Sequence, residues 1–355
     1  MIISRTPFRV SFFGGGTDYP EWYGEHGGAV LATTIDKYCY ISVRELPPFF
    51  DHRFRVVYSV VENVKEIGDI QHPAVRGVLE WLKVSKGLEI HHDGDLPARS
   101  GLGSSSAFTV GLINAVHALD GRHIAKETLA NEAIHVEQCV LRERVGLQDQ
   151  VSAAFGGFNH ITISRNGAYS VAPIVLPAER LHALQSHLML VFTGISRTAN
   201  EVAETVVTNM KNKSADMRTM QQMVEQAIDI VSSAKTDLVE FGNLLRDAWQ
   251  LKRSLSDRVT NETVDRLLDT AMKAGAIGGK LLGAGGGGFM LLFVPPDRQQ
   301  EVRDKLSRSL FVPFKFEYSG SQIIFFDSEQ DYSAEEKIRA SQSLREFREL
   351  RGGSN

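Results

Sequence analysis

Apolar runs alternate with glycine-rich turns along the first half of the chain. Residues 8–13 and 28–43 are rich in Val, Ile, Phe and Tyr, and this composition predicts two strands. Residues 54–61 are a candidate for a further strand, residues 73–84 have a helical pattern, and residues 88–92 have the pattern of a short strand. The first half therefore combines strands and helices rather than one type alone.

A glycine- and serine-rich loop leads from this short strand into two predicted helices. The first spans Ser104 to about Leu119, with Gly121 just beyond its end, and it is apolar on most faces. A helix that is apolar all round is buried rather than amphipathic. The second helix is expected from about 124 to 144 and carries apolar residues among charges.

The second half begins with LMLVFTG, residues 188–194, which has the pattern of a buried strand. After it we expect helices at 199–235, 237–252 and 261–274, a glycine cluster at 283–288, a strand at 289–294, a helix at 297–309 and two strands within 313–326. A chain of 355 residues favours two domains, although one large domain is also compatible with that length. We therefore predict an α+β protein with one domain at 1–186, a second at 187–345 and a tail at 346–355.

Composition and charge narrow the range of partners. Hydrophobic residues make up 43% and charged residues 23% of the chain, as in soluble globular proteins. The net charge of −4 lacks the basic excess of nucleic-acid-binding proteins, and any nucleotide site must create positive potential locally. The apolar runs are too short to cross a membrane and the first residues lack the apolar core of a signal peptide, so we expect a cytoplasmic protein. Cys39 and Cys139 are expected to be reduced thiols.

The string S-G-L-G-S-S-S at residues 100–106 is the strongest chemical signal. Its two glycines lack a Cβ, so the backbone can approach a ligand closely, and its last three serines open the buried helix. Exposed N–H groups at a helix start attract anions, together with the helix dipole. The string is not a Walker A loop, and by itself it also fits a serine N-cap after a glycine turn. The candidate nucleotide-binding residues are Pro97, Ser100, Gly101, Leu102, Gly103, Ser104, Ser105 and Ser106.

Two further glycine-rich strings lie on either side of this loop in the sequence. G-G-G-T-D at 14–18 follows a predicted strand, and its aspartate is suited to accept hydrogen bonds from sugar hydroxyls. K-L-L-G-A-G-G-G-G-F-M at 280–290 contains a glycine cluster that a folded domain rarely keeps without a close approach of backbones. A plain turn and a flexible surface loop are the respective alternatives. The candidate substrate-binding residues in these strings are Gly15, Gly16, Thr17, Asp18, Gly285 and Gly286.

Three charged residues accompany these strings. Arg9 lies in an otherwise largely apolar strand, where an outward-facing charge is the simplest interpretation. Glu137 lies on a helix of mixed charge, where it fits a solvated side chain. Asp149 lies between a helix end and an apolar stretch, where it fits a base, a metal ligand or the N-cap of the next helix. The residues alone leave these roles open.

In this order, the strings at 7–19, 97–107 and 280–289 resemble the three motifs of the GHMP kinase superfamily, which includes galactokinases and mevalonate kinases. The resemblance is spread over nearly the whole chain, and the order and spacing of the strings make it specific. It implies an N-terminal domain like ribosomal S5 domain 2 and a ferredoxin-like C-terminal domain. It also implies ATP and Mg²⁺ as cofactors and a small-molecule sugar phosphate as substrate, in a monomer or homodimer.

The resemblance also implies roles for individual residues. The glycine- and serine-rich loop would hold the ATP phosphates, and Ser105 and Glu137 would bind Mg²⁺. Asp149 matches the catalytic aspartate of the superfamily, and Arg9 matches the basic residue that lies beside it in galactokinases and stabilises the transferred charge. Asp18 matches the aspartate that holds sugar hydroxyls, while the third string supports the phosphate loop and the substrate side.

Within the superfamily, GGGTD, F-T-G-I-S-R-T-A at 192–199 and the third string are similar to the D-glycero-D-manno-heptose 7-phosphate kinases. That branch implies phosphorylation of the C1 hydroxyl to the 1,7-bisphosphate, for nucleotide-activated heptose synthesis. A sugar already phosphorylated at C7 needs a distal anion site, for which Arg197 and Lys280 are candidates; an exposed charge is the alternative for both. A kinase for an unphosphorylated heptose, fucose or galactose and a catalytically idle sensor of ATP and sugar are the rival functions.

Overall fold

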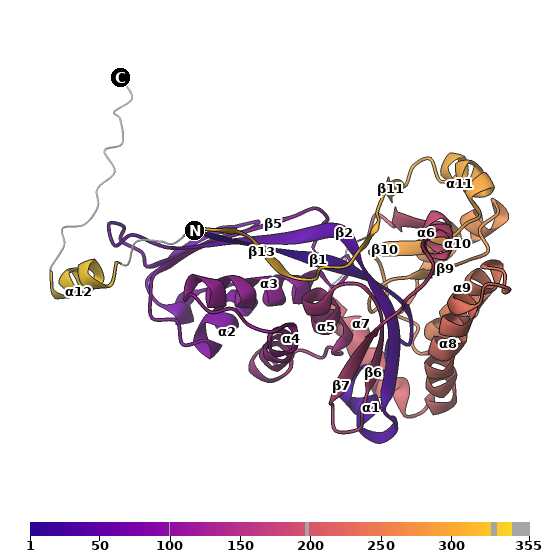
Figure 1. The fold of residues 1–355 in the computed structure, drawn as a ribbon, viewed down its shortest axis with the longest axis horizontal. Coiled ribbons are helices and arrows are strands. Elements are labelled where there is room, and N and C mark those ends of the chain that lie inside the picture. The colour runs from indigo at the N-terminus through magenta and orange to yellow at the C-terminus, as the bar shows by residue number, and fades with distance from the viewer. Residues whose placement is uncertain (99, 196–198, 328–331, 343–355) are drawn as a thin grey trace.

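The computed structural model describes residues 1–98, 100–195, 199–327 and 332–342 (Figure 1). Among them, nine strands form one large sheet in the order β13-β1-β2-β5-β3-β4, with β6 and β12 paired to β2 and β7 paired to β6. These strands are β1 (Ile2–Phe13), β2 (Gly28–Glu45), β3 (Phe54–Val57), β4 (Val61–Val64), β5 (Leu88–Gly94), β6 (Phe158–Ile163), β7 (Tyr169–Pro173), β12 (Phe316–Glu317) and β13 (Gln322–Phe326). The predicted strand at 54–61 is thus a hairpin of two short strands.

β1 explains how a charged residue comes to be enclosed. Its first residues alternate between buried and half-buried, but every residue from Thr6 to Phe13 is buried. Helices from both halves of the chain pack against it, namely α3 (Ser104–Leu119), α5 (Gln148–Phe155), α8 (Ser214–Ser232) and α9 (Val239–Ser254). A side chain in the second half of β1 therefore meets protein on either face, which rules out the outward-facing alternative for Arg9.

Helices α2 (Pro73–Trp81), α3, α4 (Lys126–His135) and α5 cover one face of the large sheet (Figure 1). α3 is buried along most of its length, as its apolar composition predicts. The single helix expected at 124–144 is wrong, because α4 passes into one π-helical turn at Val136–Val140, where Leu141 N donates to Val136 O at 2.8 Å. Arg142 then has a φ of +55°, which ends the helix.

The second half of the chain builds a smaller sheet of four strands in the order β11-β8-β10-β9, among the described residues. These are β8 (Leu188–Phe192), β9 (Gly278–Leu281), β10 (Phe289–Phe293) and β11 (Leu310–Val312), accompanied by α7 (Ala199–Met210), α10 (Glu262–Lys273) and α11 (Gln299–Lys305). The helix expected at 199–235 is wrong, because a turn at 211–213 separates α7 from α8. The predicted helix at 297–309 is shorter than expected and ends before β11.

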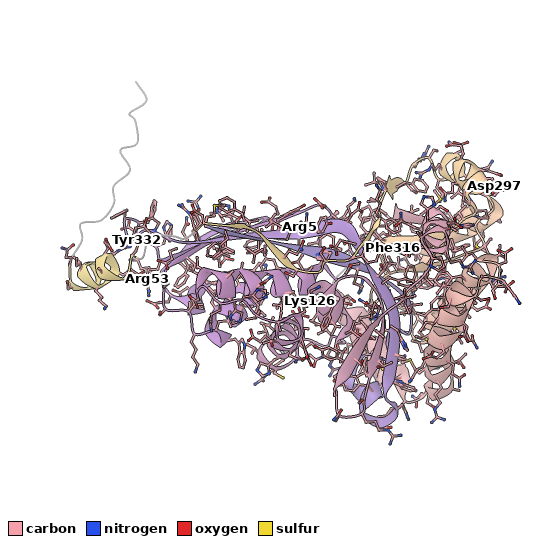
Figure 2. All side chains as sticks on the ribbon, viewed as in Figure 1. Arg5, Arg53, Lys126, Asp297, Phe316 and Tyr332 are labelled. Carbon is pink, nitrogen blue, oxygen red and sulfur yellow. The ribbon has the colours of Figure 1, made fainter. Side chains whose placement is uncertain are left out.

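The end of the chain returns to the large sheet. β12 and β13, the two strands predicted within 313–326, pair antiparallel with β2 and β1. The ring of Phe316 packs against Phe12 and Phe158, and Lys126 Nζ donates to the carbonyls of Phe155 and Ser319 (Figure 2). The α+β fold class is confirmed, whereas the division of the chain at residue 187 stays a prediction.

Three short helices lie outside the ranges in which helices were predicted. They are α1 (Pro20–His26), α6 (Ala178–Ser186) and α12 (Ser333–Ser341). α1 begins with a proline in its first turn, where the missing N–H costs nothing. Within the described ranges, no helix has the length and apolar character that a membrane span requires.

Candidate active site

The loop before α3 has the geometry of an anion site. Gly101 and Gly103 have φ angles of +79° and +73°, the left-handed conformation that favours glycine. Gly103 itself occupies the N-cap position, so the alternative of a serine N-cap is wrong. A helix start without a side-chain cap presents backbone N–H groups and the positive end of the helix dipole, which together suit a phosphate.

The glycine cluster of the third string packs directly on this loop. A Cβ added to Gly283 would lie 2.6 Å from the Cα of Gly101, and one added to Gly288 would lie 2.3 Å from Ser100 O. Phe289 N also donates to Ser100 O at 3.0 Å. Two glycines therefore face each other because no side chain fits between the two loops, and the flexible-loop alternative for the cluster is wrong.

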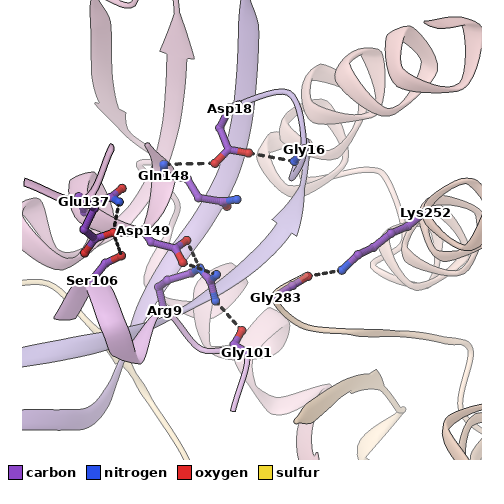
Figure 3. A network of polar contacts seen from close by, with 11 residues as sticks. Arg9, Gly16, Asp18, Gly101, Ser106, Glu137, Gln148, Asp149, Lys252 and Gly283 are labelled. Carbon is purple, nitrogen blue, oxygen red and sulfur yellow. Dashed lines mark hydrogen bonds and ion pairs between the residues drawn. The ribbon is translucent and has the colours of Figure 1, made fainter. Parts of the chain in front are cut away.

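Arg9 and Asp149 form a bidentate ion pair beside the phosphate loop (Figure 3). Arg9 Nε and Nη2 donate to the two carboxylate oxygens of Asp149, each at 2.8 Å, and Nη1 donates to Gly101 O at 2.7 Å. The Arg9 side chain is 5% exposed and that of Asp149 is 25% exposed, so the carboxylate is the more accessible partner. Because Leu147 is the N-cap of α5, the N-cap alternative for Asp149 is wrong.

Glu137 lies in the π-helical turn and is buried rather than solvated. Its Oε2 accepts hydrogen bonds from Ser106 Oγ at 2.9 Å and from the amide of Gln150, whereas its Oε1 has no partner in the described structure (Figure 3). Burial raises the pKa of Glu137 to about 8, although the hydroxyl of Ser106 acts in the opposite direction. A buried carboxylate oxygen without a partner is suited to a cation.

The donor set around Glu137 fits Mg²⁺, which prefers oxygen ligands and retains water and phosphate oxygens. In the described ranges no cluster of three or more His, Cys, Asp or Glu side chains is placed to hold a metal. Glu137 would therefore share the ion with a serine and with phosphate oxygens. The structure brings Ser106 to Glu137, while Ser105, the serine expected at the metal, is exposed in the first turn of α3.

Asp18 is buried at the turn after β1, at the opposite side of Asp149 from the phosphate loop (Figure 3). Its two oxygens accept hydrogen bonds from Gly16 N at 2.9 Å and Gln148 N at 3.3 Å. Burial, and then the charge of Asp149, raise the pKa of Asp18. Thr17 donates to the carbonyls of Gly14 and Ala29, so its hydroxyl shapes the turn.

Two polar side chains near this turn were missed in the sequence. The Oγ of Ser11 and the Oε1 of Gln148 are buried and have no hydrogen-bond partner in the described structure. Both side chains lie close to Gly15, since a Cβ added there would be 3.4 Å from Ser11 Oγ and 3.6 Å from Gln148 Nε2. Buried polar atoms without a partner are candidates for hydrogen bonds to a polar ligand.

The remaining candidate residues lie outside the contacts described so far. Lys280 is buried in β9, and its Nζ donates to Phe12 O at 2.7 Å, so the exposed-charge alternative is wrong. A Cβ added to Gly285 would lie 2.7 Å from Val259 O, so this glycine and its neighbour Gly286 meet the turn before α10. Pro97 is exposed. Arg197 lies outside the described residues.

Comparison with known families gives two matches in chain order. Residues 56–157 match the model of the GHMP kinases N terminal domain, and residues 227–312 match the model of the GHMP kinases C terminal domain. The first match contains the phosphate loop, Glu137 and Asp149, and the second contains the glycine cluster. The two matched segments thus meet at the Gly101–Gly283 contact.

Individual relatives are similar over most of the chain. A D-glycero-alpha-D-manno-heptose 7-phosphate kinase of Campylobacter jejuni is 30% identical over 314 residues, covering 85% of this chain and 91% of that protein. A bifunctional fucokinase/GDP-fucose pyrophosphorylase of Arabidopsis thaliana is 26% identical, and the match spans 30% of its length. The crystal structure of a D-glycero-D-manno-heptose 1-phosphate kinase of Bacteroides thetaiotaomicron superposes with a TM-score of 0.76, covering 92% of this chain and 100% of that chain at 24% identity.

Proposed function

Because this chain belongs to the GHMP kinase family, we propose that it uses ATP to phosphorylate the C1 hydroxyl of D-glycero-D-manno-heptose 7-phosphate, yielding the 1,7-bisphosphate and ADP. The observation that carries the proposal is the bidentate Arg9–Asp149 pair, which a hydrogen bond to Gly101 holds beside the phosphate loop. The heptose 7-phosphate named for the Campylobacter relative supports the choice of acceptor.

The donor side of the reaction uses the start of α3. The backbone N–H groups around Gly101 and Gly103 and the helix dipole hold the ATP phosphates, at a loop that the glycine cluster supports from behind. Phosphoryl transfer needs little covalent help from the protein, and most of the rate comes from positioning and charge stabilisation. The rigid contact between the two loops serves this positioning.

Asp149 and Arg9 act on the acceptor and on the moving group. Asp149 accepts the proton of the C1 hydroxyl as the new O–P bond forms and the bond from the γ-phosphorus to its bridging oxygen breaks, releasing ADP. The anomeric hydroxyl is more acidic than an ordinary alcohol, so a weak base suffices. Arg9 fixes both oxygens of Asp149 and adds positive charge where negative charge accumulates.

Glu137 Oε1 and a loop serine would hold Mg²⁺, and the bound ion would supply positive charge to neutralise the ATP phosphates. Ser106 and Gln150 keep the Glu137 carboxylate in place by bonding its other oxygen. The π-helical turn directs this carboxylate toward the phosphate loop, as π-turns often do at functional sites.

The acceptor would lie against the turn after β1. Asp18 with Gly15, Gly16 and Gln148 lines the proposed sugar recess, and the unpartnered Ser11 Oγ and Gln148 Oε1 are suited to sugar hydroxyls. For the C7 phosphate, Lys280 and Arg197 stay proposed contacts, as does a supporting role for Gly285 and Gly286.

The test is ADP release by the purified protein with a panel of acceptors: heptose 7-phosphate, unphosphorylated heptose, fucose, galactose and mannose. We expect heptose 7-phosphate to give the highest kcat/KM and a product phosphorylated at C1. A preference for fucose, the sugar in the name of the Arabidopsis relative, would overturn the proposed substrate but leave the proposed kinase activity in place. ADP release with none of these sugars, despite ATP binding, would favour a catalytically idle sensor.

A further inference from the structure

Two lysines of the second half reach the junction of the two glycine-rich loops without a carboxylate partner. Lys252 on α9 donates through Nζ to Leu281 O at 3.0 Å and to Gly283 O, the carbonyl of the residue that packs on Gly101 (Figure 3). Lys280 on β9 donates to Phe12 O. Among the described residues, neither ammonium is paired with an acidic side chain.

These two ammonium groups have more N–H donors than hydrogen-bond acceptors. An ammonium group carries three N–H donors. In the described structure Lys252 has acceptors for two of them and Lys280 has an acceptor for one. Lys280 is buried and Lys252 is half-buried, and a charge removed from water is costly unless opposite charge or acceptors replace the lost hydration.

The side chains at this junction also carry more positive than negative charge. Burial, and then the charges of Lys252 and Arg9, lower the pKa of Lys280, and burial and then Arg9 lower that of Lys252, so the three cations lie within electrostatic reach of one another. Among the described residues, the carboxylate that these three cations hydrogen-bond is that of Asp149, and it is bound to Arg9. The protein thus assembles an excess of positive charge beside a loop whose backbone already suits phosphate.

We propose that Lys252 is a positioning residue for phosphoryl transfer: it holds the 281–283 backbone against the phosphate loop, and its neutral amine takes up a proton and becomes an ammonium when the phosphates of a nucleotide bind. The inference rests on the proposed use of ATP and adds a residue and a proton step to it. In the free protein Lys252 is partly neutral; the bound polyphosphate supplies the missing negative charge and restores the ammonium. The proton comes from the buffer, and no covalent bond to the phosphates is formed or broken in this step.

The titration of Lys252 agrees with this geometry. Removal of its ammonium from water, and then the charge of Arg9, lower the pKa of Lys252 to about 7. At pH 8 the free protein therefore carries mostly neutral Lys252, and an anion beside it raises the pKa again. Charged groups on the elements that pack around α9 include Lys280 on β9, Arg9 on β1 with its partner Asp149, and Asp265 of α10, which pairs with Arg253 of α9 itself. Asp216 of α8 accepts a hydrogen bond from Ser254, α8 also carries Arg218, Glu225 and Asp229, and β1 also carries Arg5.

The experiment is calorimetric titration of the full chain with ADP at pH 8 in buffers of different ionisation enthalpy, with EDTA present. EDTA removes divalent metal, which would otherwise release a proton from Glu137 and mask the uptake. The slope of the observed enthalpy against buffer ionisation enthalpy counts the protons exchanged. For the wild type we expect net uptake of roughly half to one proton per ADP, because a group of pKa about 7 is mostly neutral at pH 8.

Three variants define the source of the proton. Lys252→Met should reduce the uptake by at least half and weaken ADP binding about 10- to 100-fold, because it removes a positive charge near the phosphates and the charged hydrogen bonds that hold Leu281 O and Gly283 O. Lys252→Arg keeps a permanent charge, so it should retain most of the affinity and still lose the uptake. Lys211→Met, at an exposed lysine in the turn before α8, is the matched control and should behave like the wild type.

Separate outcomes overturn separate statements. Proton uptake that is absent in the wild type, or unchanged in Lys252→Arg, contradicts the inference while leaving the kinase proposal intact. Absence of ADP binding by the folded wild type would overturn the proposed function and this inference with it. If Lys252→Met does not fold, as judged by its circular dichroism, Lys252→Arg decides the question alone.

Discussion

The buried Glu137 makes the stability of the metal-free protein depend on pH in a way that can be worked out from the structure. Burial raises its pKa from 4.5 to about 8. Below pH 4.5 the carboxyl is protonated in both the folded and the unfolded protein, so it has no effect on the pH dependence there. Between pH 4.5 and 8 the unfolded chain releases this proton while the folded protein retains it, so the free energy of unfolding falls as the pH rises.

The size of this effect follows from the pKa shift. A change from 4.5 to about 8 corresponds to roughly 5 kcal/mol of lost stability once the pH exceeds the folded pKa. Glu137→Gln places a neutral group of the same shape there, which still bonds Ser106 and cannot ionise. Relative to this variant, the wild type should therefore lose stability progressively from about pH 4.5 to 8.

The assay is urea denaturation of both proteins in EDTA at closely spaced pH values, followed by circular dichroism. Glu66→Gln, at an exposed glutamate, is the control and should parallel the wild type throughout. Added Mg²⁺ at pH 8 should stabilise the wild type and leave Glu137→Gln unchanged, because the ion binds the ionised carboxylate. Parallel curves for the wild type and Glu137→Gln would refute the burial argument, and equal stabilisation by Mg²⁺ would refute the metal role.

Three further predictions concern the two loops and the acceptor turn. Arg9→Met should lower kcat about 10²- to 10³-fold in steady-state assays, because it removes the charge beside the transferred group, and Arg9→Lys should recover only part of this because it cannot bond both oxygens of Asp149. Gly103→Ala should lower the free energy of unfolding by about 1–2 kcal/mol in urea denaturation, since the φ of Gly103 is +73°. Gly24→Ala should leave this free energy unchanged or raise it, because a Cβ added at Gly24 in α1 would meet no atom within 4 Å. Asp18→Asn should raise the KM for the sugar about tenfold and leave the KM for ATP unchanged; equal changes in both would contradict a sugar-side position.

The glycine-rich strings were readable in the sequence because their physical requirement is local. A turn with positive φ at Gly101 and Gly103 needs glycine regardless of the rest of the fold. The apolar character of residues 104–119 likewise predicted the buried helix α3 within a residue of its observed bounds. Features of this kind can be predicted from the sequence without knowledge of tertiary contacts.

The burial of the charged residues could not be predicted from the sequence, because it depends on tertiary packing. From its strand alone, Arg9 is expected to face outward, whereas the packing of α3, α5, α8 and α9 against β1 encloses it. Glu137 looked solvated because the π-helical turn that directs it inward has no sequence signature. Lys252 was missed although a signal existed: it follows Leu245 and Trp249 on the apolar face of α9, where a lysine is out of place.

The central claim is that Asp149, held by Arg9 beside the phosphate loop, assists the transfer of the γ-phosphoryl group to a sugar hydroxyl. The most direct measurement is a rapid-quench single turnover with radiolabelled ATP and heptose 7-phosphate, comparing the wild type with Asp149→Asn. The account predicts a transfer rate about 10²- to 10⁴-fold lower in the variant, with nearly unchanged ATP affinity. A near-normal transfer rate in Asp149→Asn would contradict it.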